Sequence, residues 1–218
     1  MELYFYLPNT WMLFSVLFAA LLVLSLIMNL QSAHFITKDG STRKFSILDL
    51  EFPSSPLDLV NTINGIYKLP DEIKNKAIRS LKNNLYLDFL FMPAIYGCVF
   101  LLCMHVSNKS TAIGHPAFAA MAWLQLAAWV FDIIENIYLL RKIKPDSQPS
   151  QRLPHQLYHY MVLAKWAIAL FGGICSLMVI LYYFISGNYH PSNLVYSLIL
   201  IAEVVAFMLL NKVLIRKV

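Results

Sequence analysis

Five blocks of mostly apolar residues constrain the fold of this chain more than any other feature: residues 11–30, 85–106, 116–140, 156–185 and 193–214. Each holds about 20 residues or more, the length that a helix needs to cross a hydrocarbon core about 30 Å thick. The chain is 59% hydrophobic and 13% charged, outside the balance of ordinary soluble domains. The sequence therefore predicts an all-α integral membrane protein, a five-transmembrane-helix bundle forming a single membrane domain over residues 1–218.

Lysine and arginine are distributed asymmetrically around these blocks. Of the 17 lysine and arginine residues, eight lie between the first and second blocks, four lie between the third and fourth blocks, and three lie at the C-terminal end. Only Lys109 lies in a connection on the other side, and Lys165 lies within the fourth block. Because cytoplasmic loops carry the excess of lysine and arginine, we expect the N-terminus outside and the C-terminus in the cytoplasm, in a bacterial plasma (inner) membrane. This topology explains the net charge of +5, so we expect the lipid bilayer, and no nucleic acid, as partner.

Residues 31–84 form the longest connection between apolar blocks, and we expect them to be cytoplasmic. Asp39 and Gly40 separate two β-prone runs, a pattern that predicts a hairpin because glycine accepts the positive φ of a tight turn. In the second run, residues 48–52 alternate between apolar and acidic side chains. Such alternation predicts a strand with one apolar face and one acidic face, the latter formed by Asp49 and Glu51.

Two amphipathic helices are expected after the hairpin. Ser55 and Pro56 have the residue types of an N-cap and a first helical position, and a second helix begins near Pro70. Residues 70–85 place apolar side chains on one face and lysine and arginine on the others. This second helix either lies on the inner leaflet as a basic amphipathic helix or packs on the hairpin with a solvated charged face.

Ionisable side chains within the apolar blocks are the candidate functional residues. Asp88, Asp132, Glu135 and Lys165 all lie in the half of their blocks expected to be cytoplasmic, and Asn136 follows Glu135 on the same helical face. An unpaired charge in hydrocarbon costs several kcal/mol, so such groups pair or mark a functional site. One lysine cannot neutralise three carboxylates, which favours a functional pocket over a simple clip between helices.

His155 and His159 are spaced i, i+4 at the start of the fourth block, where two imidazoles could share a metal ion. Because no third ligand follows at a characteristic spacing, these are weak metal candidates and no metal or other cofactor is assigned. Glu203 lies alone in the fifth block, where a protonated carboxyl bonded to a neighbouring helix is the simplest interpretation.

The combination "LDLEF", "LYLDFLF", "FDIIENIYLL" and "AKWAIALFGG", over residues 48–173, resembles a group of small multi-pass bacterial membrane proteins. The resemblance implies that Asp49 belongs to one pattern with the acids and the lysine of the apolar blocks. The chain is also loosely similar, at the level of fold, to the emopamil-binding and sigma-2 type membrane proteins. Those are four-helix bundles with buried acids that bind sterols and cationic amphiphiles, but their motifs do not match this chain residue by residue and its fifth apolar block is extra, so the likeness concerns the fold alone.

Three functions are compatible with these features. The first is a pocket that binds or processes a lipid or another amphiphile, in which Asp132, Glu135 and Lys165 are the catalytic candidates. Its ligand-binding candidates are Asp49, Glu51, Asp88 and Asn136. The second is a proton- or cation-coupled transporter acting as a homodimer, and the third is a non-catalytic assembly subunit that docks partners on residues 31–84.

Overall fold

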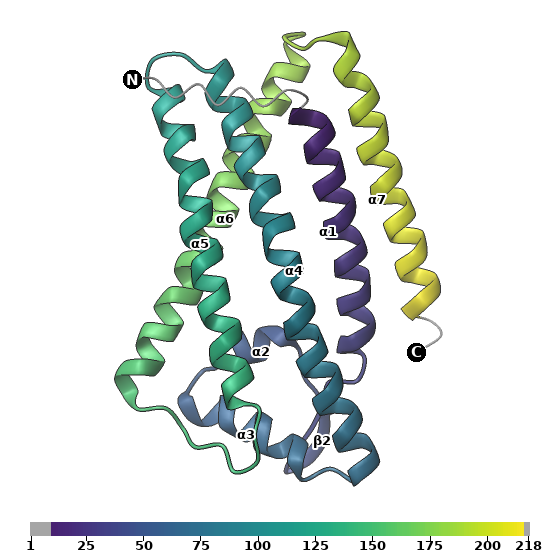
Figure 1. Ribbon diagram of the computed structural model, residues 1–218, viewed down its shortest axis with the longest axis vertical. Coiled ribbons are helices and arrows are strands. Elements are labelled where there is room, and N and C mark those ends of the chain that lie inside the picture. Colours follow the sequence, from purple (N-terminus) through teal and green to yellow (C-terminus); the bar gives the residue numbers. More distant parts are fainter. Residues whose placement is uncertain (1–9, 216–218) are drawn as a thin grey trace.

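The computed structural model describes residues 10–215, which contain five helices long and apolar enough to cross a membrane. These five helices run along the long axis of the molecule and confirm the expected number of long apolar helices (Figure 1). Their composition fits a multi-pass, membrane-embedded protein. The helices are α1 (Thr10–Ser32), α4 (Asp71–Lys109), α5 (Gly114–Lys142), α6 (Arg152–Ile185) and α7 (Leu194–Ile215), with a 3₁₀ turn η1 (Pro191–Asn193) before α7.

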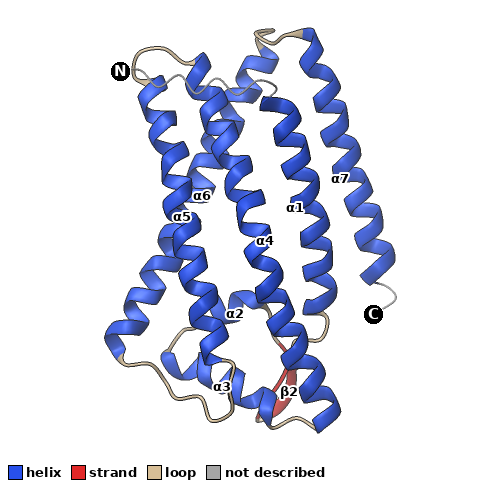
Figure 2. Cartoon of the chain, in the orientation of Figure 1, coloured by secondary structure: helices blue, strands red, loops and turns tan. Residues whose placement is uncertain are grey.

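The remaining elements gather at one end of the bundle, which we call the hairpin end (Figure 2). Strands β1 (Ile36–Asp39) and β2 (Ser41–Lys44) pair antiparallel around Gly40, whose φ of 73° is favourable only for glycine. Helices α2 (Ile47–Glu51) and α3 (Pro56–Tyr67) follow. The hairpin turn therefore lies where the Asp39–Gly40 pair predicts it.

Residues 47–51 form a helix rather than the predicted second strand. Ser46 is the N-cap, and its backbone N–H donates to Asp49 Oδ2 at 2.7 Å while the Asp49 N–H donates back to Ser46 Oγ. This capping box stabilises a helical turn and overrides the alternating pattern. Leu48 and Leu50 consequently lie on different faces, with exposed fractions of 49% and 0%.

The largest cluster of buried apolar side chains lies at the hairpin end. It joins α2, α3 and the first turns of α4 to the last turn of α5 and the start of α6, through Leu50, Ile63, Leu81, Leu139 and Val162 among others. Helix α3 begins as expected, with Ser55 Oγ accepting from the Asp58 N–H and Pro56 at the first helical position. The hairpin end is thus packed on the long apolar helices and positions α2 beside them.

Helix α4 is continuous and, at about 1.5 Å per residue, about 58 Å long, so it extends well beyond a hydrocarbon core. Its first turns contribute Ala77 and Leu81 to the buried cluster at the hairpin end. The amphipathic helix predicted over residues 70–85 is therefore the beginning of α4, and its apolar face packs on the hairpin end. Of the two predicted alternatives, this arrangement fits a helix that packs on the hairpin rather than one that lies on the inner leaflet.

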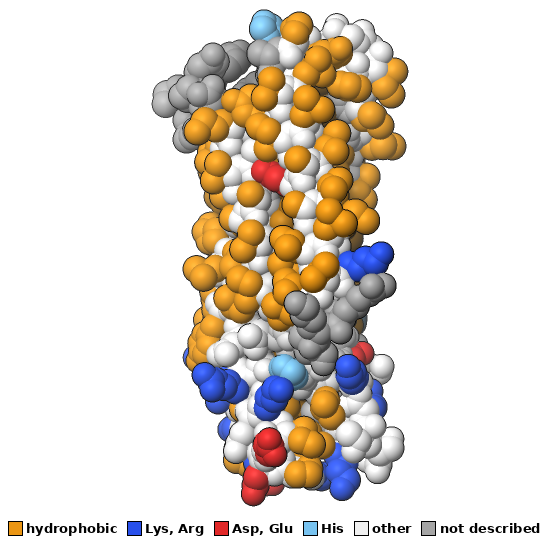
Figure 3. Space-filling model, turned by 90° about the vertical axis from the view of Figure 1, so that its right-hand side faces the viewer, with side chains coloured by type: hydrophobic (Ala, Val, Ile, Leu, Met, Phe, Trp, Pro, Cys, Tyr) orange, Lys and Arg blue, Asp and Glu red, His pale blue; other side chains and the backbone are white. Residues whose placement is uncertain are grey.

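The face of the bundle seen in Figure 3 is apolar along most of its length, and lysine and arginine side chains gather toward its lower end. Helix α7 packs against α1 and exposes large apolar side chains such as Leu198, Ile201 and Met208. This surface has the composition that hydrocarbon favours. Two of the basic residues used for orientation, Arg216 and Lys217, lie outside the described residues.

Candidate polar pocket

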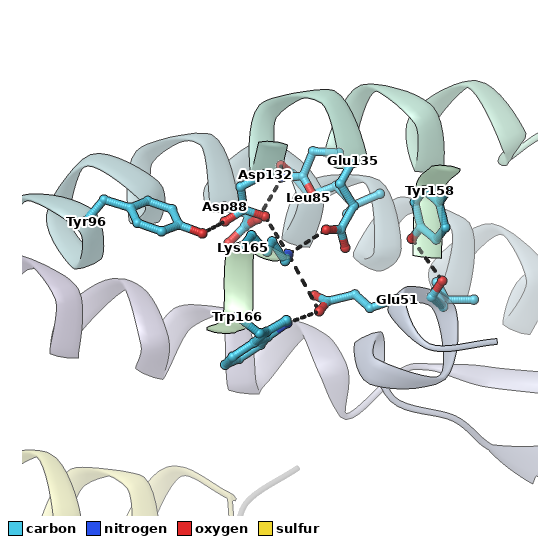
Figure 4. Close-up of polar contacts among 11 residues, drawn as sticks. Glu51, Leu85, Asp88, Tyr96, Asp132, Glu135, Tyr158, Lys165 and Trp166 are labelled. Carbon is cyan, nitrogen blue, oxygen red and sulfur yellow. Dashed lines mark hydrogen bonds and ion pairs between the residues drawn. The ribbon is translucent and has the colours of Figure 1, made fainter. Parts of the chain in front are cut away.

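Four elements bring polar side chains together where the long apolar helices meet the hairpin end (Figure 4). Helix α4 contributes Asp88, α5 contributes Asp132 and Glu135, α6 contributes Lys165, and α2 contributes Glu51. On α5, Asp132 and Glu135 are three residues apart, so their side chains project from one face and reach Lys165 together.

Lys165 lies at the centre of this cluster and is only 4% exposed. Its Nζ donates to Asp132 Oδ1 at 2.7 Å, lies 2.6 Å from Glu135 Oε2 and lies 3.6 Å from Glu51 Oε2. The approach to Glu135, which is 1% exposed, is an ion pair without hydrogen-bond alignment. One ammonium thus faces three carboxylates on two other helices, a concentration of charge that burial makes costly unless the groups stay paired.

Tyr96 on α4 extends the cluster toward the middle of the bundle. Its hydroxyl donates to Asp132 Oδ2 at 2.9 Å, so each oxygen of Asp132 accepts one hydrogen bond. Asp132 is buried in this setting, with an exposed fraction of 7%. Two donors from two different helices therefore fix the orientation of this carboxylate.

Asn136 links α5 to α4 beside this group. Its amide Nδ2 donates to Asp88 Oδ2 at 2.7 Å and to the backbone carbonyl of Leu85 at 3.3 Å. Asn136 is buried, whereas Asp88 is half-buried and lines the space between the helices. Asn136 therefore positions Asp88 and itself stays out of that space.

Glu51 reaches the cluster from α2, outside the five long apolar helices. The Trp166 indole N–H donates to Glu51 Oε2 at 3.0 Å, and about two turns earlier on α6 the Tyr158 hydroxyl donates to the Leu50 carbonyl at 3.1 Å. Burial raises the pKa of Glu51 above its ordinary range, while the positive charge of Lys165 and the Trp166 hydrogen bond lower it. These two hydrogen bonds hold α2 against α6, and α2 therefore bounds the polar cluster at the hairpin end.

A cavity of about 220 Å³ lies against these groups. Its polar lining comes from Glu51, Asp88, Asp132 and Lys165, together with Asn84 and Tyr96. Its apolar lining comes from Met28, Ile47, Leu48, Leu85, Phe91, Ile95, Trp166 and Ala169. Leu48 and Trp166 are 49% and 39% exposed, so the cavity opens at the surface beside them. An apolar space with a few convergent polar groups is the usual form of a small-molecule site.

No protein-family model, curated protein or solved structure matches this chain. The candidate function therefore depends on the geometry of this pocket, without support from a relative.

Several residues singled out in the sequence lie away from the cavity. Asp49 is exposed and completes the capping box of α2, and Glu135 lies behind Lys165 rather than in the lining. His155 and His159 are on the first turns of α6, and among residues 10–215 no group of three or more His, Cys, Asp or Glu side chains could hold a metal ion. Glu203 lies on α7, in a separate groove against α1.

Three aromatic residues that form hydrogen bonds in or beside the polar cluster were not predicted from the sequence: Tyr96, Tyr158 and Trp166. Each is an aromatic residue in an apolar block, where burial in a core is its commonest role, so its hydrogen bond gives no pattern in the sequence. For Trp166 the sequence does contain one indication of a role near the charged residues, because Trp166 directly follows Lys165.

Proposed function

We propose that this protein binds the headgroup of a lipid or another amphiphile in the polar pocket, with the hairpin end in the cytoplasm and the pocket at the inner leaflet. The cavity between Asp88, Asp132 and Trp166 is the observation that carries the proposal, because it joins buried polar groups to an apolar lining and an opening. A soluble polar substrate would leave that apolar lining in contact with water.

The size of the cavity supports a headgroup rather than a whole lipid. At about 220 Å³ it is smaller than the roughly 300–1,000 Å³ of pockets that enclose a drug-sized ligand. An occupant would therefore place its polar end against the acids and leave its apolar chains outside, beside Leu48 and Trp166. Those side chains are exposed at the end of the apolar part of the bundle, at the depth where lipid headgroups would lie.

The balance of charge supports a headgroup that donates hydrogen bonds. Glu51, Asp88 and Asp132 line the cavity as acceptors, whereas Lys165 is already engaged by three carboxylates. Hydroxyl or amine groups would satisfy the remaining acceptor sites, and an amine would also offset the excess negative charge. Asp132 is the candidate acid or base if the bound headgroup is processed, because it lines the cavity and Lys165 and Tyr96 orient it.

Native mass spectrometry after gentle extraction tests this proposal. We expect an amphiphile to be released from the wild-type protein and to be reduced at least several-fold in Asp88→Asn, which keeps an oxygen for Asn136 but removes the negative charge. Asp146→Asn, an equivalent change at an exposed position in the connection between α5 and α6, should retain the amphiphile. Identical lipid profiles for the wild type and Asp88→Asn would exclude a headgroup site at Asp88.

A further inference from the structure

Basic side chains from three segments lie just beyond the end of α1: the turn after α1, strand β2 and helix α4. His34 follows the last residue of α1 by two positions, and Lys44 ends β2 opposite Ile36. Lys76 lies on the first turns of α4, which packs against α1 through a hydrogen bond from Asn84 Nδ2 to the Met28 carbonyl at 3.0 Å. We call His34, Lys44 and Lys76 the basic patch, and none of them lines the cavity.

The antiparallel arrangement of α1 and α4 places His34 and Lys76 at similar depth. From the Asn84 and Met28 contact, His34 lies six residues further along the chain, and Lys76 lies eight residues back along α4. At about 1.5 Å per helical residue, both positions lie about 9–12 Å beyond that contact. The apolar block of α1 ends at Leu30, so the basic patch borders the apolar surface, where the headgroups of a bilayer would begin.

The charges of the basic patch are uncompensated in the described part of the chain. Lys44 and Lys76 are exposed, and neither forms an ion pair with a described residue. Burial lowers the pKa of His34, and the positive charges of Lys76 and Lys44 lower it further. The imidazole can donate a hydrogen bond in either protonation state. Figure 3 shows a histidine with lysine or arginine side chains close to it, directly below the apolar face.

We propose that the basic patch binds the phosphate of an anionic phospholipid in the same leaflet as the hairpin end. Two ammonium groups and an imidazole match the charge and the acceptor oxygens of a phosphate, and the adjoining apolar surface of α1 accommodates acyl chains. A juxtamembrane cluster of basic side chains gains free energy from an anionic lipid surface in this way. This site lies outside the polar pocket and does not depend on the ligand proposed there.

Thermal unfolding of the full-length protein in a neutral detergent tests the basic patch. Phosphatidylglycerol should raise the unfolding midpoint by roughly 4–8 °C more than phosphatidylcholine does. Inorganic phosphate at the same concentration should produce no such shift. No preference for phosphatidylglycerol in the wild type, or an equal shift with inorganic phosphate, would overturn the proposal.

Two matched double variants locate the effect. Lys44→Gln/Lys76→Gln should lose the difference between the two lipids, whereas Lys68→Gln/Lys144→Gln removes the same charge from exposed positions elsewhere and should keep it. The preference is measured within each variant, so a change in baseline stability does not affect it. His34→Gln, which leaves both lysines in place, should reduce the difference. A preference retained in Lys44→Gln/Lys76→Gln, or lost equally in both double variants, would contradict the proposal.

Discussion

Lys165 on α6 donates to Asp132 on α5 at 2.7 Å, and this buried ion pair is the centre of the polar pocket. Replacing Lys165 with methionine keeps most of the side-chain volume but leaves Asp132 and Glu135 without their cation. We expect Lys165→Met to lower the free energy of unfolding by about 3–5 kcal/mol, the usual effect of removing one partner of a buried pair. Chemical unfolding in detergent micelles measures the change.

The control for Lys165→Met is a variant that also removes the charges of its partners, Asp132 and Glu135. Lys165→Met/Asp132→Asn/Glu135→Gln removes the uncompensated negative charges as well and should recover part of the lost stability. Lys144→Met, at an exposed position, should change stability by less than about 0.5 kcal/mol. A triple variant less stable than Lys165→Met would show that the two carboxylates do not depend on Lys165.

Glu51 should make stability depend on pH. Its pKa is raised chiefly by burial, so the folded protein holds this proton more tightly than the unfolded chain does. The stabilising contribution of Glu51 is therefore complete below its ordinary pKa and is lost as the pH rises through the folded pKa. The difference in unfolding free energy between the wild type and Glu51→Gln should change with pH in that direction.

Chemical unfolding at a series of pH values from 4 to 9, about the range over which the protonation of raised carboxyl groups changes, measures this difference. Glu72→Gln, at an exposed position on the first turn of α4, serves as the control and should give a curve parallel to that of the wild type. Parallel curves for the wild type and Glu51→Gln would contradict a buried role for Glu51.

The close approach of α6 to α4 and α5 depends on Gly172. A Cβ there would lie 2.6 Å from Gln125 Nε2 and 3.4 Å from Cys103 Sγ, whereas at Gly173 the nearest atom would be 3.8 Å away. Gln125 is fully buried and donates to the Ile168 carbonyl, so it cannot move without losing that bond. Gly172→Ala should destabilise the protein by about 1–3 kcal/mol, and Gly173→Ala should be neutral or slightly stabilising. Equal effects in thermal unfolding would contradict this packing.

Asp49 and Glu51 are close in sequence but have different predicted roles. Asp49→Ala removes the capping box of α2 and should cost about 1 kcal/mol of stability. Because Asp49 is exposed and is not among the residues that line the cavity, the bound amphiphile should be unchanged. Unfolding curves and native mass spectra of the same preparation separate the two effects. Loss of the amphiphile at unchanged stability would show that Asp49 belongs to the binding site after all.

The long apolar helices could be predicted from the sequence because hydrophobic length alone identifies them. The spacing of Asp132, Glu135 and Asn136 likewise places them on one helical face. Their partners could not be derived in the same way, because the rotation of α5 relative to α4 and α6 decides that Asn136 contacts Asp88 while Glu135 contacts Lys165.

Residues 48–52 show how a local pattern can mislead. Their alternation predicts a strand. However, Asp49 forms a capping box with Ser46, and burial of Leu50 in the core also favours the helical turn. The helix turns Glu51 toward α6, where Trp166 and Lys165 bind it. The sequence makes Glu51 a ligand-binding candidate, but its contacts with α6 are a tertiary feature that no motif in this segment indicates.

Filling the cavity tests the proposed binding site most directly. Ala169→Phe places a ring into the lining without changing a charged group, and Ala167→Phe adds the same ring at an exposed position on α6. In native mass spectrometry, Ala169→Phe should lose the bound amphiphile while the wild type and Ala167→Phe retain it, with all three proteins unfolding cooperatively. An amphiphile bound equally by folded Ala169→Phe and Ala167→Phe would contradict the pocket as the binding site.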